Sequence, residues 1–285
     1  MGQPIPRREY AMDFDASALP TEPMSRAITL ARKVPEVTVF FWIAKLLTTA
    51  LGESTSDYLV FHINPYVAVT LGGIGLVVAL GLQLLTRRYI AWVYWLAVVM
   101  VAVFGTMAAD VLHIVLGVSY LDSTVFFAAC VAVIFAAWYA TERTLSIHSI
   151  TTLRRELFYW ATVMATFALG TAAGDLAASG ALTGSGKPLG YLDAGLLFIA
   201  LFALPALAYW LLKLNPIVAF WFAYIITRPL GASFADWFGK PVGATGLGYG
   251  DGPVSLVLTL LIVAVVAYLT ITRVDVQRDP VHARR

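Results

Sequence analysis

Four aspartates recur at one position in a repeated pattern and are the residues best suited to chemistry. Each follows a tryptophan by 15 residues and a glycine by five. The aspartates are Asp57, Asp110, Asp175 and Asp236, the glycines Gly52, Gly105, Gly170 and Gly231, and the tryptophans Trp42, Trp95, Trp160 and Trp221. Carboxylates supply negative charge and hard oxygen ligands, so a cluster of them binds protons or a small cation.

The elements that position these aspartates must be membrane helices. Of the 285 residues, 60% are hydrophobic and only 13% are charged, against about 25% charged residues in soluble domains. This composition excludes a disordered chain, a secreted disulfide scaffold and a soluble nucleic-acid binder. Eight apolar segments approach the length of about 20 residues that spans a bilayer. They cover about 35–60, 64–86, 89–117, 122–140, 156–180, 189–212, 216–239 and 253–272.

The recurring triplet lies in alternate segments, which predicts an all-α polytopic membrane protein with eight transmembrane helices from four tandem two-helix repeats. The expected repeats cover about 35–86, 88–140, 153–212 and 214–272, within a membrane domain of residues 33–273. Residues 1–32 and 274–285 are interpreted as cytoplasmic tails. Because every repeat has two spans, all four repeats share one orientation and any symmetry axis follows the membrane normal. A turn element with a Leu-Gly pair, a tyrosine and an aspartate also recurs, ending in Asp122, Asp193 and Asp251.

Positive charge predicts the orientation of the spans. Fifteen lysines and arginines fall on the side of the termini, whereas only Lys187 and Lys240 fall on the other side. Positively charged loops stay in the cytoplasm, so both termini are expected to be cytoplasmic in a bacterial inner membrane.

The pattern resembles a bacterial family of uncharacterised integral membrane proteins built from four tandem two-helix repeats, each with a characteristic tryptophan. The resemblance covers about residues 33–273 and includes the stretch from Thr144 to His148. It implies the fold described above and no particular reaction.

Residues 7, 11 and 15 positions after each tryptophan share one face of their helix. The first tier holds Thr49, Ala102, Phe167 and Arg228, and the second holds Glu53, Thr106, Thr171 and Ala232. The aspartates lie about 22 Å above the tryptophans. A charge inside the bilayer costs about 2.5–3.5 kcal/mol on the insertion scale, so we expect the carboxylates to converge on a central axis. Alternatively, the aspartates are architectural and cap turns or accept from tyrosine hydroxyls.

The residues that break the fourfold pattern are further candidates. Glu53 and Asp57 lie one turn apart, and Arg228 precedes Pro229, which is expected to kink its helix. We expect Arg228 and Lys45 to be counter-ions of Glu53 and the aspartates, with contact to a substrate anion as the alternative. His113 follows Asp110 by three residues and either shares its face or packs as an ordinary core histidine. The tryptophans are expected to anchor at the interface or to pack.

These patterns favour a transporter of a small cation, either a divalent metal or coupled to protons. Its expected ligands are the four aspartates with Glu53, Thr106 and Thr171, and its charge-pairing or gating residues are Arg228, Lys45 and His113. Soft metals are disfavoured because this ligand set is oxygen-based. The expected partners are lipid and a small cation, with no nucleic acid and no cofactor, while the metal and the oligomeric state stay open.

Two other function classes are alternatives to transport. A non-catalytic membrane scaffold or sensor is the main alternative. Residues 248–251 match the glycine and aspartate pattern of intramembrane aspartyl proteases, but they lie in an external turn without the tyrosine–aspartate partner. The chain is therefore not expected to be an enzyme.

Overall fold

The computed structural model describes residues 32–180 and 189–276, and in these ranges the secondary structure is entirely helical. Most of the expected tails and Lys187 lie outside the described residues. The long helices are α2 (Val39–His62), α3 (Pro65–Leu85), α4 (Ala91–Asp110), α5 (Tyr120–Glu142), α6 (Leu153–Ala178), α7 (Tyr191–Leu212), α8 (Pro216–Gly239) and α9 (Asp251–Thr272). A π-helical turn, Val111–Val115, continues α4. The expected all-α class is confirmed.

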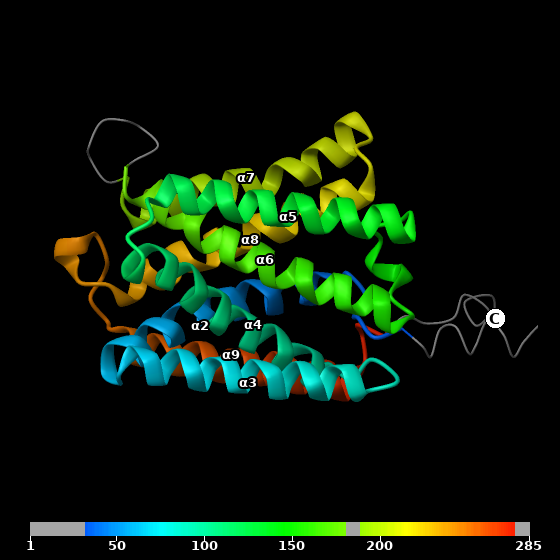
Figure 1. Cartoon of the computed structure of the whole chain (residues 1–285), viewed down its shortest axis with the longest axis horizontal. Coiled ribbons are helices and arrows are strands. Elements are labelled where there is room, and N and C mark those ends of the chain that lie inside the picture. Colours follow the sequence, from blue (N-terminus) through cyan, green and yellow to red (C-terminus); the bar gives the residue numbers. More distant parts are fainter. Residues whose placement is uncertain (1–31, 181–188, 277–285) are drawn as a thin grey trace, which may run out of the picture.

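Seven of the described helices are long and apolar enough to cross a membrane, which makes this a multi-pass membrane protein. The helix outside this set is α2, which carries Lys45, Glu53 and Asp57. These charged side chains lower its hydropathy although the helix has 24 residues. Both ends of the described chain lie at the same end of the bundle, where the backbone N–H of Glu36 donates to the carbonyl oxygen of Asp275 at 2.9 Å (Figure 1).

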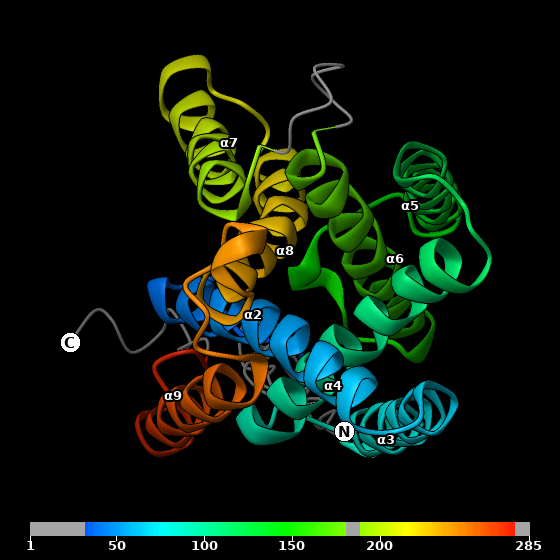
Figure 2. The same cartoon turned by 90° about the vertical axis from the view of Figure 1, so that its left-hand side faces the viewer.

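The helices form an inner ring and an outer layer. The four helices that carry the recurring triplet, α2, α4, α6 and α8, pack side by side in a closed ring (Figure 2). Each outer helix packs mainly on the inner helix of the following repeat: α3 on α4, α5 on α6 and α7 on α8. The last outer helix, α9, packs on α2 and so closes the circle. Every repeat therefore buries its outer helix against its neighbour.

The recurring glycines allow the inner helices to touch. A Cβ atom added to Gly105 would lie 2.9 Å from Cβ of Phe167 in α6. One added to Gly231 would lie 2.9 Å from the backbone nitrogen of Ala50, where α8 meets α2. The residues that the four glycines face are Ala102, Phe167, Arg228 and Thr49, each in the next inner helix of the circle. Small residues permit such close packing in membranes, so the glycines explain why the ring closes.

Three of the outer helices, α5, α7 and α9, carry opposite charge at their two ends. Asp122, Asp193 and Asp251 lie in the first turns of α5, α7 and α9, where the helix dipole favours an anion. The same three helices end at Arg143, Lys213 and Arg273, which adopt a left-handed backbone conformation. The recurring turn element is thus the start of an outer helix, and its aspartate stabilises the first turn of that helix.

Candidate functional site

Arg228 lies at the centre of the ring and joins all four inner helices. It projects from α8 and is 1% exposed. Its Nη2 donates to Oε2 of Glu53 in α2 at 2.5 Å and to Oγ1 of Thr171 in α6 at 2.7 Å. It also donates to the hydroxyl of Thr106 in α4. The four repeats therefore meet at Arg228. Its three partners, Glu53, Thr106 and Thr171, occupy equivalent positions in the other three repeats.

The two threonines face the guanidinium rather than an open ligand site. The Thr106 hydroxyl donates to the carbonyl oxygen of Ala102 at 3.0 Å, and the Thr171 hydroxyl donates to that of Phe167 at 3.2 Å. Each hydroxyl accepts from Arg228 with its remaining lone pairs. Both hydroxyl groups therefore accept hydrogen bonds from Arg228. The sequence pattern did not predict this contact, because it favoured both threonines as cation ligands.

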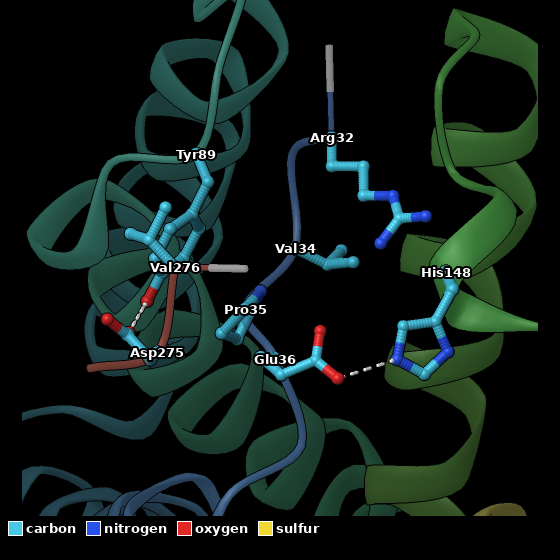
Figure 3. Close-up of a pocket in the computed structure, with 8 residues that line it drawn as sticks. All are labelled: Arg32, Val34, Pro35, Glu36, Tyr89, His148, Asp275 and Val276. Atoms are coloured by element: carbon cyan, nitrogen blue, oxygen red, sulfur yellow. Dashed lines mark hydrogen bonds and ion pairs between the residues drawn. The ribbon is translucent and has the colours of Figure 1, made fainter. Parts of the chain in front are cut away.

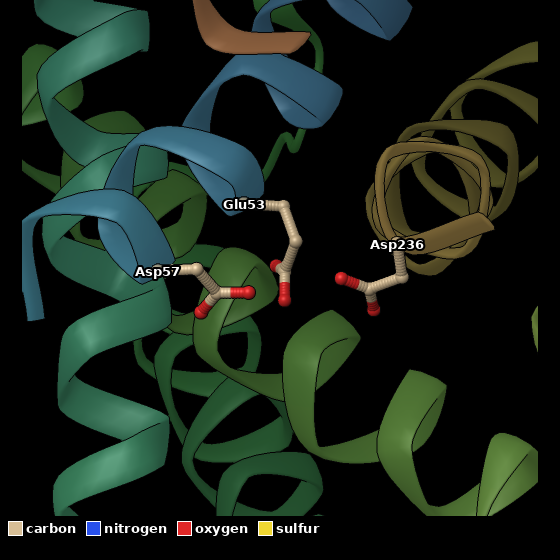
Figure 4. Close-up of side chains that lie close together, drawn as sticks. All are labelled: Glu53, Asp57 and Asp236. Atoms are coloured by element: carbon tan, nitrogen blue, oxygen red, sulfur yellow. The ribbon is translucent and has the colours of Figure 1, made fainter. Parts of the chain in front are cut away.

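Three carboxylates gather beside this arginine. One oxygen each from Glu53, Asp57 and Asp236 lie within 4.8 Å of one another (Figure 4). Glu53 and Asp57 come from adjacent turns of α2, and Asp236 faces them from α8. Oxygen ligands at this spacing fit a hard cation such as Mg²⁺, Ca²⁺ or Mn²⁺. We refer to these three residues as the acidic cluster.

The other two recurring aspartates lie near the acidic cluster but outside it. Asp110 and Asp175 interact electrostatically with Glu53 and with Asp57. Neither carboxylate accepts a hydrogen bond from any residue in the described ranges. The four aspartates thus occupy one end of the ring, and two of them approach to within ligand distance of Glu53.

Lys240 is a site residue that the sequence pattern missed. Its ammonium group donates to Asp57, and Nζ lies 3.5 Å from Oδ2 of Asp251 and 3.9 Å from Oδ1 of Asp236. Burial lowers the pKa of Lys240, but the carboxylates of Asp57, Asp236 and Asp251 outweigh burial and raise the pKa above its ordinary value. From the sequence, Lys240 is interpreted as a residue of an external loop. Its spacing of four residues from Asp236 nevertheless places the two side chains one helical turn apart.

Lys45 does not pair with the acids as expected. It is 1% exposed, and its Nζ lies 3.8 Å from the ring centroid of Phe167 and 4.1 Å from that of Tyr224. Nζ has no hydrogen-bond partner among the described residues. Glu53 is eight residues further along α2, or about 12 Å away along the axis. The aromatic faces are closer and attract the ammonium group through cation–π contact.

The contacts of His113 agree with the alternative of an ordinary packed histidine rather than with a residue that faces Asp110. It lies in the π-helical turn, which changes its angular position relative to α4. Its Nδ1 donates to the carbonyl oxygen of Val118 at 2.7 Å, and its ring stacks on Tyr120 with centroids 3.6 Å apart. These contacts are local, so His113 stabilises the turn between α4 and α5.

An aromatic layer fills the other end of the ring. Tyr94 and Tyr159 are buried and share a hydrogen bond of 2.5 Å between their hydroxyl groups. Trp221 packs against Tyr224, and its indole N–H donates to the carbonyl oxygen of Leu145 at 2.9 Å. Trp95, Trp160 and Trp221 are all buried. Three of the recurring tryptophans therefore pack in the core, as the second of the two expectations for them has it.

A second polar group joins the ends of the described chain. The hydroxyl of Tyr89 donates to Asp275, and His148 lies 3.4 Å from Glu36 (Figure 3). These residues line a small cavity of about 40 Å³ together with Arg32. Burial raises the pKa of Asp275, although the hydrogen bond from Tyr89 opposes this. The group lies outside the membrane-spanning helices, with Glu36 before the start of α2 and Asp275 after the end of α9.

Comparison with known proteins identifies the repeat. A family model for a repeat of unknown function matches residues 40–89, 93–144, 158–214 and 219–275. Each match covers most of one inner helix and the outer helix that follows it. No curated protein and no solved structure matches the chain. The four matches cover most of the chain, so it belongs to the family described as Repeat of Unknown Function (DUF347).

Proposed function

We propose that this protein is a gated carrier for a small cation, which binds at the acidic cluster. The observation that carries this proposal is the balance of charge in the inner ring. From Lys45 to the end of the ring at Lys240, carboxylates outnumber basic groups by five to three: Glu53, Asp57, Asp110, Asp175 and Asp236 against Lys45, Arg228 and Lys240. The further charged residues of the inner helices, Glu156, Arg154 and Arg155, pair with Lys33 and Glu142 at the other end. Uncompensated charge is costly inside a bilayer, so additional positive charge, as protons or as a metal ion, would stabilise the site.

The ligand atoms favour a hard cation over a soft one. The acidic cluster offers carboxylate oxygens within 4.8 Å of one another. Divalent cations such as Mg²⁺, Ca²⁺ and Mn²⁺ prefer these ligands. Protons compete for the same carboxylates, because like charges at short range favour protonation. Proton coupling is therefore part of the proposed mechanism.

The residues on either side of the cluster favour a carrier over an open pore. Arg228 occupies the ring centre and repels cations, while the aromatic layer closes the ring beyond it. Lys240 covers the acidic cluster from the opposite side. A cation could pass only if these contacts break in turn, as alternating access requires.

The proposed membrane placement uses all eight helices. At 24 residues α2 is long enough to span, since a helix rises about 1.5 Å per residue and the hydrocarbon core measures about 30 Å. Its charged residues face the ring, where Glu53 meets Arg228. The arginine-rich loops are assigned to the cytoplasm of a bacterial inner membrane, together with both termini.

Uptake of Mn²⁺ into proteoliposomes tests the proposal. Replacing the cluster residues with Asp57→Asn and Asp236→Asn together should lower uptake about tenfold or more, because two charged ligands are lost. The matched control is Asp193→Asn, an exposed aspartate at the start of α7, which should leave uptake within about twofold. Equal uptake by the wild-type protein and the double variant would contradict transport at this site and favour a scaffold or sensor.

A further inference from the structure

Lys240 breaks the fourfold pattern at the acidic cluster. It stands four residues after the recurring aspartate of the last repeat. The corresponding residues in the other three repeats are Phe61, Ile114 and Ser179. Only one of the four equivalent positions therefore brings a positive charge to this end of the ring.

The ammonium group of Lys240 contacts carboxylates that would also be ligands of a bound cation. It contacts Asp57 of α2, Asp236 of α8 and Asp251 of α9. Two of these residues belong to the acidic cluster, whose oxygens lie within 4.8 Å of one another. A bound cation and the Lys240 ammonium would therefore compete for the same carboxylate oxygens.

The backbone around Lys240 is held firmly, so its side chain is the movable part. After α8 ends, the chain folds back on it: the N–H of Gly248 donates to the carbonyl oxygen of Lys240 at 2.8 Å, and that of Gly250 donates to Gly239 at 3.0 Å. The N–H of Tyr249 donates to the carbonyl oxygen of Phe238 at 3.1 Å. The Lys240 side chain is still 18% exposed, which leaves it a way to solvent by rotation of its own bonds.

We propose that Lys240 is a tethered cation that occupies the binding site when no substrate is present and that an incoming cation displaces. This inference rests on the proposed function and adds how the empty site is neutralised. It also narrows the substrate class. Arg228 neutralises Glu53, so withdrawal of Lys240 leaves the two negative charges of Asp57 and Asp236 in the acidic cluster and a third, that of Asp251, beside it. A divalent cation, with twice the charge of the ammonium group, would neutralise the two charges in the cluster.

Binding of Mn²⁺ to the purified full chain tests the inference. Lys240→Gln keeps a polar side chain but removes the competing charge, so the affinity for Mn²⁺ should rise about tenfold if the ammonium occupies the site nine-tenths of the time. Lys240→Arg should bind like the wild-type protein, because it keeps the charge. The matched control Lys213→Gln, at the end of α7, should change nothing. An equal or weaker affinity in Lys240→Gln would overturn the inference.

A second measurement uses the wild-type protein and does not depend on how a variant folds. A small amine-reactive reagent should label Lys240 slowly without Mn²⁺ and faster with it, because displacement moves the amine into solvent. Labelling of Lys240 that Mn²⁺ slows or leaves unchanged would overturn the inference.

The two proposals fail in different ways. If Mn²⁺ binding depends on Asp57 and Asp236 but ignores the charge at residue 240, only the tethered-cation inference fails. If neither the wild-type protein nor Lys240→Gln binds or transports Mn²⁺, both the proposed function and the inference are overturned.

Discussion

At the scale of single residues, the ion pair of Arg228 and Glu53 is the polar contact that joins α8 to α2 at the ring centre. Both side chains are buried, and the guanidinium also holds the hydroxyl groups of Thr106 and Thr171. Removing one partner would leave a buried charge without compensation. The contact therefore couples the fold of the ring to the charge state of the acidic cluster.

Arg228→Met should lower the free energy of unfolding by about 3–5 kcal/mol, because Glu53 loses its counter-ion. Adding Glu53→Met to this variant should restore most of the loss, since it removes the stranded carboxylate. Thermal unfolding of the purified protein in detergent measures both effects. If Arg228→Met unfolds at the same temperature as the wild-type protein, the ion pair does not stabilise the ring.

Asp275 predicts a pH dependence at the end of the bundle that holds the described chain ends. Burial raises the pKa of Asp275 above the ordinary value of 3.8, so the folded state holds this proton more tightly than the unfolded state. The stabilisation is complete below the unfolded pKa and is lost as the pH rises through the folded pKa. Asp275→Asn should remove this part of the pH dependence while its amide oxygen still accepts from Tyr89.

Thermal unfolding of the wild-type protein and Asp275→Asn, followed from about pH 4 to about pH 8, measures the difference. The stability of the wild-type protein relative to the variant should decrease as the pH rises. Parallel curves would mean that Asp275 titrates alike in the folded and unfolded chains.

The sequence pattern identified some of these residues and not others. Arg228 and Glu53 could be matched because each breaks the repeat on the same helical face. The contacts of Lys45 could not be predicted, because its aromatic neighbours Phe167 and Tyr224 come from two other repeats. Lys240 was missed because the fold of residues 240–250 determines that its side chain points back to the cluster.

At the scale of the elements, the inner helices depend on their recurring glycines. Gly52→Ala should lower the free energy of unfolding by about 1–3 kcal/mol, because the new methyl group overpacks the contact with α4. Its Cβ would contact Cβ of Ala102 and lie 2.8 Å from the backbone carbon of the same residue. Backbone atoms cannot move away without shifting the helix.

The matched control is Gly81→Ala in α3, where no atom lies within 4 Å of the added Cβ. This variant should be neutral or more stable, since alanine favours a helix more than glycine does. Thermal unfolding compares the two variants. If Gly52→Ala is as stable as Gly81→Ala, the close approach of α2 and α4 is not required for the ring.

Hydropathy and the tryptophan spacing located the helices well, but their ends less well. The segment expected at 89–117 divides into α4 and a π-helical turn, which ends at Val115. This turn depends on the contact of His113 with Val118 and Tyr120. The periodicity of a sequence indicates which face of a helix is apolar, but not where α-helical hydrogen bonding changes to π-helical hydrogen bonding.

At the scale of the whole molecule, the four repeats were predictable and their packing was not. The spacing of tryptophan, glycine and aspartate predicted four parallel units, and the family match has the same order. Nothing in the spacing indicated that each outer helix packs on the inner helix of the next repeat. The outer helices are apolar on most of their surface, so their sequences carry little information about the partner helix.

This packing makes the ring a single unit in which every repeat supports the next. The acidic cluster draws on the first and last repeats, which meet only because α8 packs against α2 and α9 closes the circle. A cation at the cluster would therefore join the two ends of the repeat array. The site exists only in the closed ring.

The most direct measurement of this account is the position of Mn²⁺ in crystals of the full chain, found by anomalous scattering at the manganese edge. The account predicts a peak between the carboxylates of Glu53, Asp57 and Asp236, with the Lys240 side chain turned away. Crystals of the Asp57→Asn and Asp236→Asn double variant should lack that peak. Manganese found only on surface carboxylates of the wild-type protein, with Lys240 still seated in the cluster, would contradict the account.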